Sequence, residues 1–214
     1  MSSATLYRAS GLALLLGALL GIIGTILNTF LFPGRGNPTQ YTSALYVSVT
    51  LLSFIGSLLL VLGLPGMCVR QATRAGWLGL IGFVLTIVGG ILFTSLSGVT
   101  FLVLPWLAVN APQLAAGNGP PAIFVYVLVA SLLFAVGGVL LGIATMRAEV
   151  LPRWAGLLIL VGAVLNLVDF PLSGIIGGIV GLVAFVLFAL GLGWIGYVLW
   201  IAKGEALRQT VLTS

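Results

Sequence analysis

Apolar residues run along the chain in long blocks that short polar stretches separate. Each block is close to the roughly 20 residues that a helix needs to cross the ~30 Å hydrocarbon core of a bilayer. The blocks fall at approximately 9–32, 42–65, 75–98, 122–146, 154–172 and 174–202. The pattern therefore predicts a bundle of six transmembrane helices in a single domain, 1–214, in which 99–121 forms an outer loop.

The composition within the blocks favours helices over strands. Strands of a membrane barrel alternate apolar and polar residues, whereas runs such as "GLALLLGALLGII" are apolar at nearly every position. The 30 glycines suit close packing between helices in lipid. The chain is 61% hydrophobic and 5% charged, against about 25% charged residues in a soluble domain. We therefore expect an all-α, multi-pass membrane protein.

The few charges predict an orientation. Cytoplasmic loops are enriched in Lys and Arg, and a cytoplasmic N-terminus leaves only Arg35 of the eight basic residues outside. The inner set is Arg8, Arg70, Arg74, Arg147, Arg153, Lys203 and Arg208. Both termini are then cytoplasmic, and "VRQATRAGW" is the first inner loop. Trp77 and Trp154 would belong to the inner aromatic belt, and Tyr41 and Tyr46 to the outer one.

The chain offers little material for catalysis or metal binding. It has no histidine, which removes the commonest general base and most zinc, copper and haem ligand sets. The single cysteine, Cys68, has neither a disulfide partner nor a metal motif around it. The net charge of +5 is spread thinly and forms no basic patch with interleaved aromatics, so nucleic acid is not expected as a partner.

The acidic residues do not form a catalytic pair. Glu149 lies between Arg147 and Arg153 and is expected to pair locally, as is Glu205 in the C-terminal tail. The sequence therefore predicts a non-enzymatic protein with no catalytic residue, no metal site and no cofactor.

Asp169 is the one acidic residue inside a predicted span, which makes it a candidate functional residue. At about 1.5 Å per residue it lies ~24 Å above Arg153, close to the outer surface. We expect an outer polar cluster of Asn28, Arg35, Asn166 and Asp169, with Asp169 and Arg35 approaching one another. The alternative is a polar turn residue at the interface, where the helix ends.

The three odd-numbered spans begin alike, with an arginine followed by two glycines six residues apart. The pairs are Gly11/Gly17, Gly76/Gly82 and Gly156/Gly162. "FAVG" at 134–137 and "FALG" at 188–191 echo one another in the even-numbered spans. These similarities suggest three tandem helical hairpins, although chance agreement is an alternative in so glycine-rich a chain.

Small residues four apart put a smooth face on a helix and let backbones approach closely. The last span carries the longest such face, at Gly177, Gly181, Ala189 and Gly193. This face serves either packing inside the monomer or contact with a partner subunit.

The predicted outer loop at 99–121 carries no charge, and its first half is apolar. An open coil would leave its amides unsatisfied in lipid. We expect a short helix at the outer interface or a cap over the bundle, with a re-entrant pore segment as the alternative.

Two stretches, "RASGLALLLGALLGIIGTIL" and "MRAEVLPRWAGLLILVGAVLNLVDF", resemble a domain-of-unknown-function family of small bacterial membrane proteins with six predicted helices. The "LPRWAG" entry to the fifth span is the most specific part of this resemblance. The resemblance implies six helices in a bacterial plasma (inner) membrane and carries no activity with it.

These observations favour an accessory or scaffold subunit of a membrane complex, or a homo-oligomer, in contact with membrane lipids and other subunits. A transporter or channel for a small or apolar solute is the first alternative, and a lipid- or pigment-binding protein the second. A continuous cavity lined by Thr25, Asn28, Thr86 or Asn166 would favour transport, and a filled interior would favour the accessory role.

Overall fold

The computed structural model describes residues 3–32, 38–116, 121–169, 172 and 174–212, and most of these are helical, with no strand among them. The helices are α1 (Ser3–Leu31), α2 (Pro38–Tyr41), α3 (Ala44–Asn110), α4 (Pro112–Ala115), α5 (Pro121–Ala148), α6 (Arg153–Asp169) and α7 (Gly174–Leu212). The predicted all-α class is therefore confirmed.

Four of the helices in the described part of the chain are long and apolar enough to cross a membrane. They are α1, α3, α5 and α7. α6, with 17 residues, is shorter than these. The structure thus indicates a membrane-embedded protein, as the apolar blocks predict.

α3 is 67 residues long and is kinked at Gly76, whose φ of 57° and ψ of −158° are not helical. Its two arms, 44–75 and 77–110, fold back on one another. The rings of Phe54 and Phe101 lie 5.4 Å apart between centroids. A Cβ placed on Gly90 would lie 2.9 Å from Cγ2 of Val61. The arms therefore lie side by side and antiparallel.

The first arm extends ten residues beyond the predicted span 42–65, so the expected inner loop "VRQATRAGW" is helical up to Gly76. Pro65 lies inside the helix instead of ending it. The reason is packing, because buried residues continue past the proline at helical spacing. Leu60, Leu64, Met67 and Gln71 are all at most 6% exposed.

The second arm extends to Asn110, so the prediction of a loop at 99–121 is wrong over its first half. That half is helical, as expected, but it continues the arm without a break. Burial again explains the difference, since Ala108 packs in a small cluster with Tyr41, Tyr46 and Ala115. Tyr41 and Tyr46 are 7% and 4% exposed, so they are core residues of this end and not members of an exposed aromatic belt.

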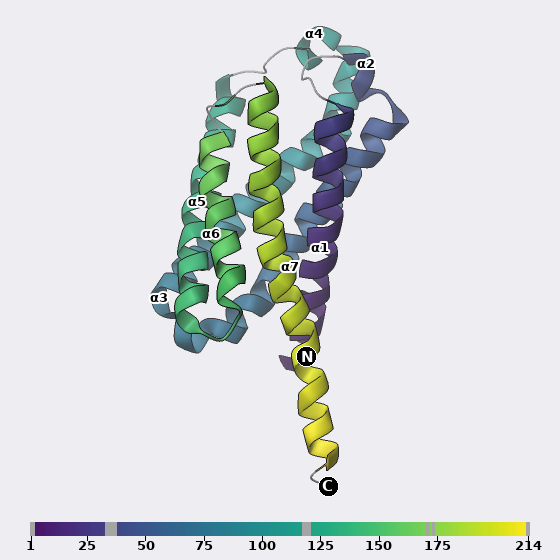
Figure 1. Ribbon diagram of the computed structural model, residues 1–214. Helices are drawn as coiled ribbons and strands as arrows, with labels where there is room; N and C mark the ends of the chain where they lie inside the picture. The colour runs from purple at the N-terminus through teal and green to yellow at the C-terminus, as the bar shows by residue number, and fades with distance from the viewer. Residues whose placement is uncertain (1–2, 33–37, 117–120, 170–171, 173, 213–214) are drawn as a thin grey trace.

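The helices pack in chain order around a closed circuit (Figure 1). α1 packs on the first arm of α3 and the second arm packs on α5. α5 then contacts α6, α6 contacts α7, and α7 returns to α1. Large side chains fill the space inside. Those less than 2% exposed are Leu14, Met67, Leu141, Ile159, Leu192, Ile195 and Leu199, with Gln71, Thr86 and Thr145.

The start of α1, the kink of α3 and the turn between α5 and α6 lie at the end of the molecule that holds both termini, whereas α2 and α4 lie at the opposite end (Figure 1). The basic residues of the described helices fall in these segments and in the C-terminal part of α7. Arg70 lies over the ring of Tyr7, 5.9 Å from its centroid, which joins the kink region to the start of α1. Arg147 is in the last turn of α5, and Arg153 is the first residue of α6. Arg153 pairs with Glu149, which confirms the expected local ion pair.

Candidate functional site

In two helix pairs, a glycine on one helix faces a glycine on the other and the backbones are in contact. A Cβ on Gly11 would lie 2.8 Å from the carbonyl oxygen of Gly196, and one on Gly196 would lie 2.7 Å from that of Gly11. Gly142 and Gly156 make the same reciprocal contact, at 2.7 and 2.8 Å. We call these α1–α7 and α5–α6 contacts the glycine interfaces.

The second glycine of each predicted pair also has a consistent place. Added Cβ atoms would lie 2.6–2.7 Å from the backbone nitrogen of the facing helix, with Gly17 facing Leu60, Gly82 facing Leu141 and Gly162 facing Phe188. In each case a small residue lies four positions before the facing residue on the same helix. Gly56 precedes Leu60, Gly137 precedes Leu141 and Ala184 precedes Phe188. Gly191 of "FALG" therefore does not correspond to Gly137 of "FAVG" in the packing.

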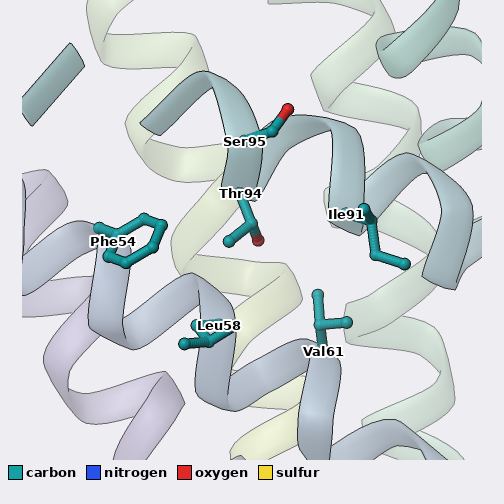
Figure 2. A pocket seen from close by; sticks show the side chains of 6 residues that line it. All are labelled: Phe54, Leu58, Val61, Ile91, Thr94 and Ser95. Carbon is teal, nitrogen blue, oxygen red and sulfur yellow. The ribbon is translucent and has the colours of Figure 1, made fainter. Parts of the chain in front are cut away.

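The interface between the two arms of α3 differs from the glycine interfaces. The first glycine of its pair, Gly76, forms the kink and has no atom within 4 Å of an added Cβ. Side chains rather than backbones meet between the arms. They leave a pocket of about 210 Å³, shown in Figure 2 and lined by Phe54, Leu58, Val61, Ile91, Thr94 and Ser95.

Thr94 supplies a buried polar atom at this pocket. Its side chain is 8% exposed, and its hydroxyl oxygen is buried without a hydrogen-bond partner. Figure 2 shows it directed toward the arm that carries Phe54 and Leu58, whereas the Ser95 hydroxyl points the other way. The Ser95 hydroxyl is already engaged, with the carbonyl of Leu92 and the hydroxyl of Tyr126.

Other hydroxyls in α3 are satisfied by the helix itself, as is usual for Ser and Thr in apolar helices. Each donates to a carbonyl three or four residues earlier. They belong to Ser48, Thr50, Ser53, Ser57, Thr86, Ser95, Ser97 and Thr100. The sequence gives a signal for the pocket in "VGGILFTSLSG", where small and hydroxyl residues interrupt an apolar span. That signal does not say which hydroxyl lacks a partner.

The expected outer polar cluster is only partly described. Asp169, at the end of α6, lies against α7, with Oδ2 2.7 Å from a Cβ added at Gly181. Asn166 has a buried amide oxygen without a hydrogen-bond partner. Asn28 is half-buried, and its carbonyl accepts a hydrogen bond from the backbone N–H of Phe32. Arg35 lies outside the described residues, so its contact with Asp169 stays a prediction.

The small-residue face of α7 is covered by the protein's own helices. A Cβ at Gly177 would lie 2.6 Å from the carbonyl oxygen of Leu172, and one at Gly181 would lie 2.7 Å from Oδ2 of Asp169. Ala189 is fully buried, and a Cβ at Gly193 would lie 3.0 Å from Cβ of Ala18. These four residues therefore take part in packing within the monomer.

The sequence does not reveal one buried polar contact at the kinked end of α3. Gln71 falls in a stretch predicted as an inner loop, yet it is 1% exposed. Its amide oxygen accepts a hydrogen bond of 3.2 Å from the hydroxyl of Thr145 on α5, which is fully buried and shares its proton with the carbonyl of Leu141 at 2.8 Å. The contact ties the first arm to α5.

The described residues hold no group of three His, Cys, Asp or Glu side chains that could bind a metal ion. The fold and this site define the class of the protein as an all-helical, membrane-embedded one. Comparison with protein-family models, with curated proteins and with solved structures gives no match. Its function therefore has to be inferred from its own residues and their geometry.

Proposed function

We propose that the chain crosses a bacterial plasma membrane six times as three tandem hairpins, with both termini in the cytoplasm. Each arm of α3 is longer than the roughly 20 residues needed for one crossing, and the fold-back at Gly76 supports two crossings by α3. α6, at 17 residues, spans about 26 Å and supplies another. The basic residues gathered at the end that holds the termini support a cytoplasmic assignment.

Within that membrane we propose a non-enzymatic role as an accessory or scaffold subunit, or as a homo-oligomer. The observation that carries this proposal is the filled interior. Thr86, one of the residues expected along a solute path, is 0% exposed, and its hydroxyl donates to the carbonyl of Gly82 at 2.7 Å. Neither it nor Thr25, Asn28 or Asn166 lines the pocket between the arms.

The assembly state tests the functional proposal. The protein is extracted into lipid nanodiscs from native membranes, and its mass is measured by native mass spectrometry. We expect a discrete assembly heavier than one 22.1 kDa chain. A single chain at all concentrations, together with saturable solute uptake by proteoliposomes, would replace the scaffold proposal with a transporter.

The orientation has its own test. Two variants in a Cys68→Ser background, Thr73→Cys and Thr39→Cys, place the same substitution at exposed positions near opposite ends of the molecule. A maleimide that cannot cross the membrane is applied to intact cells. We expect it to label the residue at 39 and to label that at 73 only after lysis. The reverse pattern would invert the proposed orientation.

A further inference from the structure

We infer that the pocket between the arms of α3 holds part of an acyl chain of a membrane glycerolipid, and that the Thr94 hydroxyl donates to its ester carbonyl. A buried hydroxyl without a partner costs free energy, and an acceptor on a bound molecule removes that cost. A lipid ester supplies such an acceptor next to a long apolar chain, which fits the remaining lining of the pocket.

The pocket is lined almost entirely by apolar atoms, and Thr94 lies on the second arm at about the same distance along the chain from Gly76 as Leu58 on the first. Thr94 and Ser95 lie farther from the kink than Val61 and Ile91, which are each fifteen residues from Gly76 along their own arm. At 1.5 Å per residue, Thr94 lies about 27 Å from Gly76. When Gly76 is placed at the inner edge of the ~30 Å hydrocarbon core, this hydroxyl lies near the outer edge, where ester carbonyls are found. This depth rests on the proposed crossing of the membrane by each arm.

The size and opening of the pocket also fit a chain segment. An engineered apolar cavity of about 150 Å³ accepts benzene, and this pocket measures about 210 Å³. Leu58 and Ile91 are 38% and 52% exposed, so the pocket opens on the lipid-facing surface. The rest of the lipid can therefore stay in the bilayer while one segment enters.

Water is a poor occupant by comparison. A buried water makes about three hydrogen bonds to polar partners. Within the lining, the Ser95 hydroxyl is already bound to Leu92 and Tyr126, which leaves the hydroxyl of Thr94. A carbonyl needs only that one donor.

Photolabelling tests the site. The protein in nanodiscs is exposed to a phospholipid that carries a diazirine on its acyl chain, and adducts are located by peptide mass spectrometry. We expect adducts concentrated within 54–61 and 91–95. Leu58→Trp fills the pocket and should lower this labelling about tenfold, which corresponds to ~1.4 kcal/mol. Leu62→Trp makes the same change at a 59% exposed position outside the lining and should leave it unchanged.

Competition tests the hydrogen bond. An unlabelled ester phospholipid should compete about threefold better than its ether analogue, as expected for one hydrogen bond between groups in a membrane. Thr94→Val should abolish that difference. Thr100→Val, whose hydroxyl is already bonded to Leu96, should keep it.

Three outcomes would overturn the proposal. They are equal labelling of the two tryptophan variants, equal competition by ester and ether lipids in the parent protein, and stronger competition by free fatty acid than by either. Labelling is read on each chain separately, so it does not depend on the assembly state. A wrong membrane orientation would be detected separately from lipid binding, by the maleimide labelling of the cysteine variants.

Discussion

At the α5–α6 interface two glycines bring backbones into contact, whereas between the arms of α3 the contacts are made by side chains and a pocket remains. Gly142 and Gly156 lie opposite one another in the first case. In the second, Gly76 occupies the kink, and two glycines that face the opposite arm, Gly90 and Gly98, meet the side chains of Val61 and Phe54. The same glycine pattern therefore gives close packing in one place and a turn in another.

The difference matters because lipid, unlike water, does not drive helices together. Apolar tails solvate a helix about as well as another helix does, so association depends on packing and hydrogen bonds. A gap between helices in a membrane is open to a lipid chain and need not collapse. The loose interface of α3 is thus a natural place for a bound lipid, and the glycine interfaces leave no such room.

Adding one methyl group to each kind of interface should have opposite effects. In Gly142→Ala the new Cβ would lie 2.7 Å from the Gly156 carbonyl oxygen, so the helices must separate. We expect the free energy of unfolding to fall by about 1–3 kcal/mol. In Gly98→Ala the nearest atom is a ring carbon of Phe54 at 3.4 Å, an ordinary contact.

The helix propensity of alanine, worth up to about 1 kcal/mol over glycine, should leave the Gly98→Ala variant as stable as the parent or more stable. Unfolding by SDS in mixed micelles measures both variants. Similar losses at the two positions would remove the distinction between the interfaces.

Gly76→Ala should destabilise the protein although space is available for the methyl group. The φ of 57° and ψ of −158° belong to a region essentially restricted to glycine, and no atom lies within 4 Å of the added Cβ. The cost is in the backbone and should be about 1–3 kcal/mol. The same unfolding assay, with Gly98→Ala as the control in the same helix, measures it. An unchanged stability would show that the kink does not need this conformation.

The sequence was sufficient to predict the class of the fold because spans in lipid must be long, apolar and helical. It was insufficient for the ends of α3. The predicted spans end at 65 and 98, but burial of residues such as Met67 and Ala108 extends both arms. The pairing of distant residues decides such ends, and a local pattern does not contain that information.

The candidate site shows the same limit. The small-residue face of α7 was visible in the sequence, but whether Gly181 meets a partner or Asp169 depends on how α6 lies. The unpartnered hydroxyl of Thr94 depends on a gap between two arms that periodicity cannot reveal. Gln71 and Thr145 lie 74 positions apart, so no local motif connects them.

The hydrogen bond between Thr145 and Gln71 should contribute a smaller amount, which Thr145→Val measures. Bonds between helices in membranes average about 0.6 kcal/mol, and the variant also leaves the buried Gln71 oxygen without this donor. Thr86→Val is the matched control, because the Thr86 hydroxyl bonds only to its own helix, at Gly82. We expect thermal unfolding in micelles to shift for the first variant and hardly at all for the second. Equal shifts would mean that the bond to Gln71 adds nothing to the tie between the arm and α5.

The smallest effect is expected where a glycine faces a side chain that can move. A Cβ at Gly181 would lie 2.7 Å from Oδ2 of Asp169. The nearest atom to a Cβ at Gly178 would be the methyl carbon of Thr29, 3.9 Å away. Because the carboxylate can rotate and the carbonyl of Gly156 cannot, Gly181→Ala should cost less than about 1 kcal/mol. Gly178→Ala should cost nothing in the same unfolding assay. A loss at Gly181 as large as that at Gly142 would mean that Asp169 is held by its own interactions as firmly as a backbone. Gly181 would then be there to fit a fixed carboxylate, and not to bring two helices together.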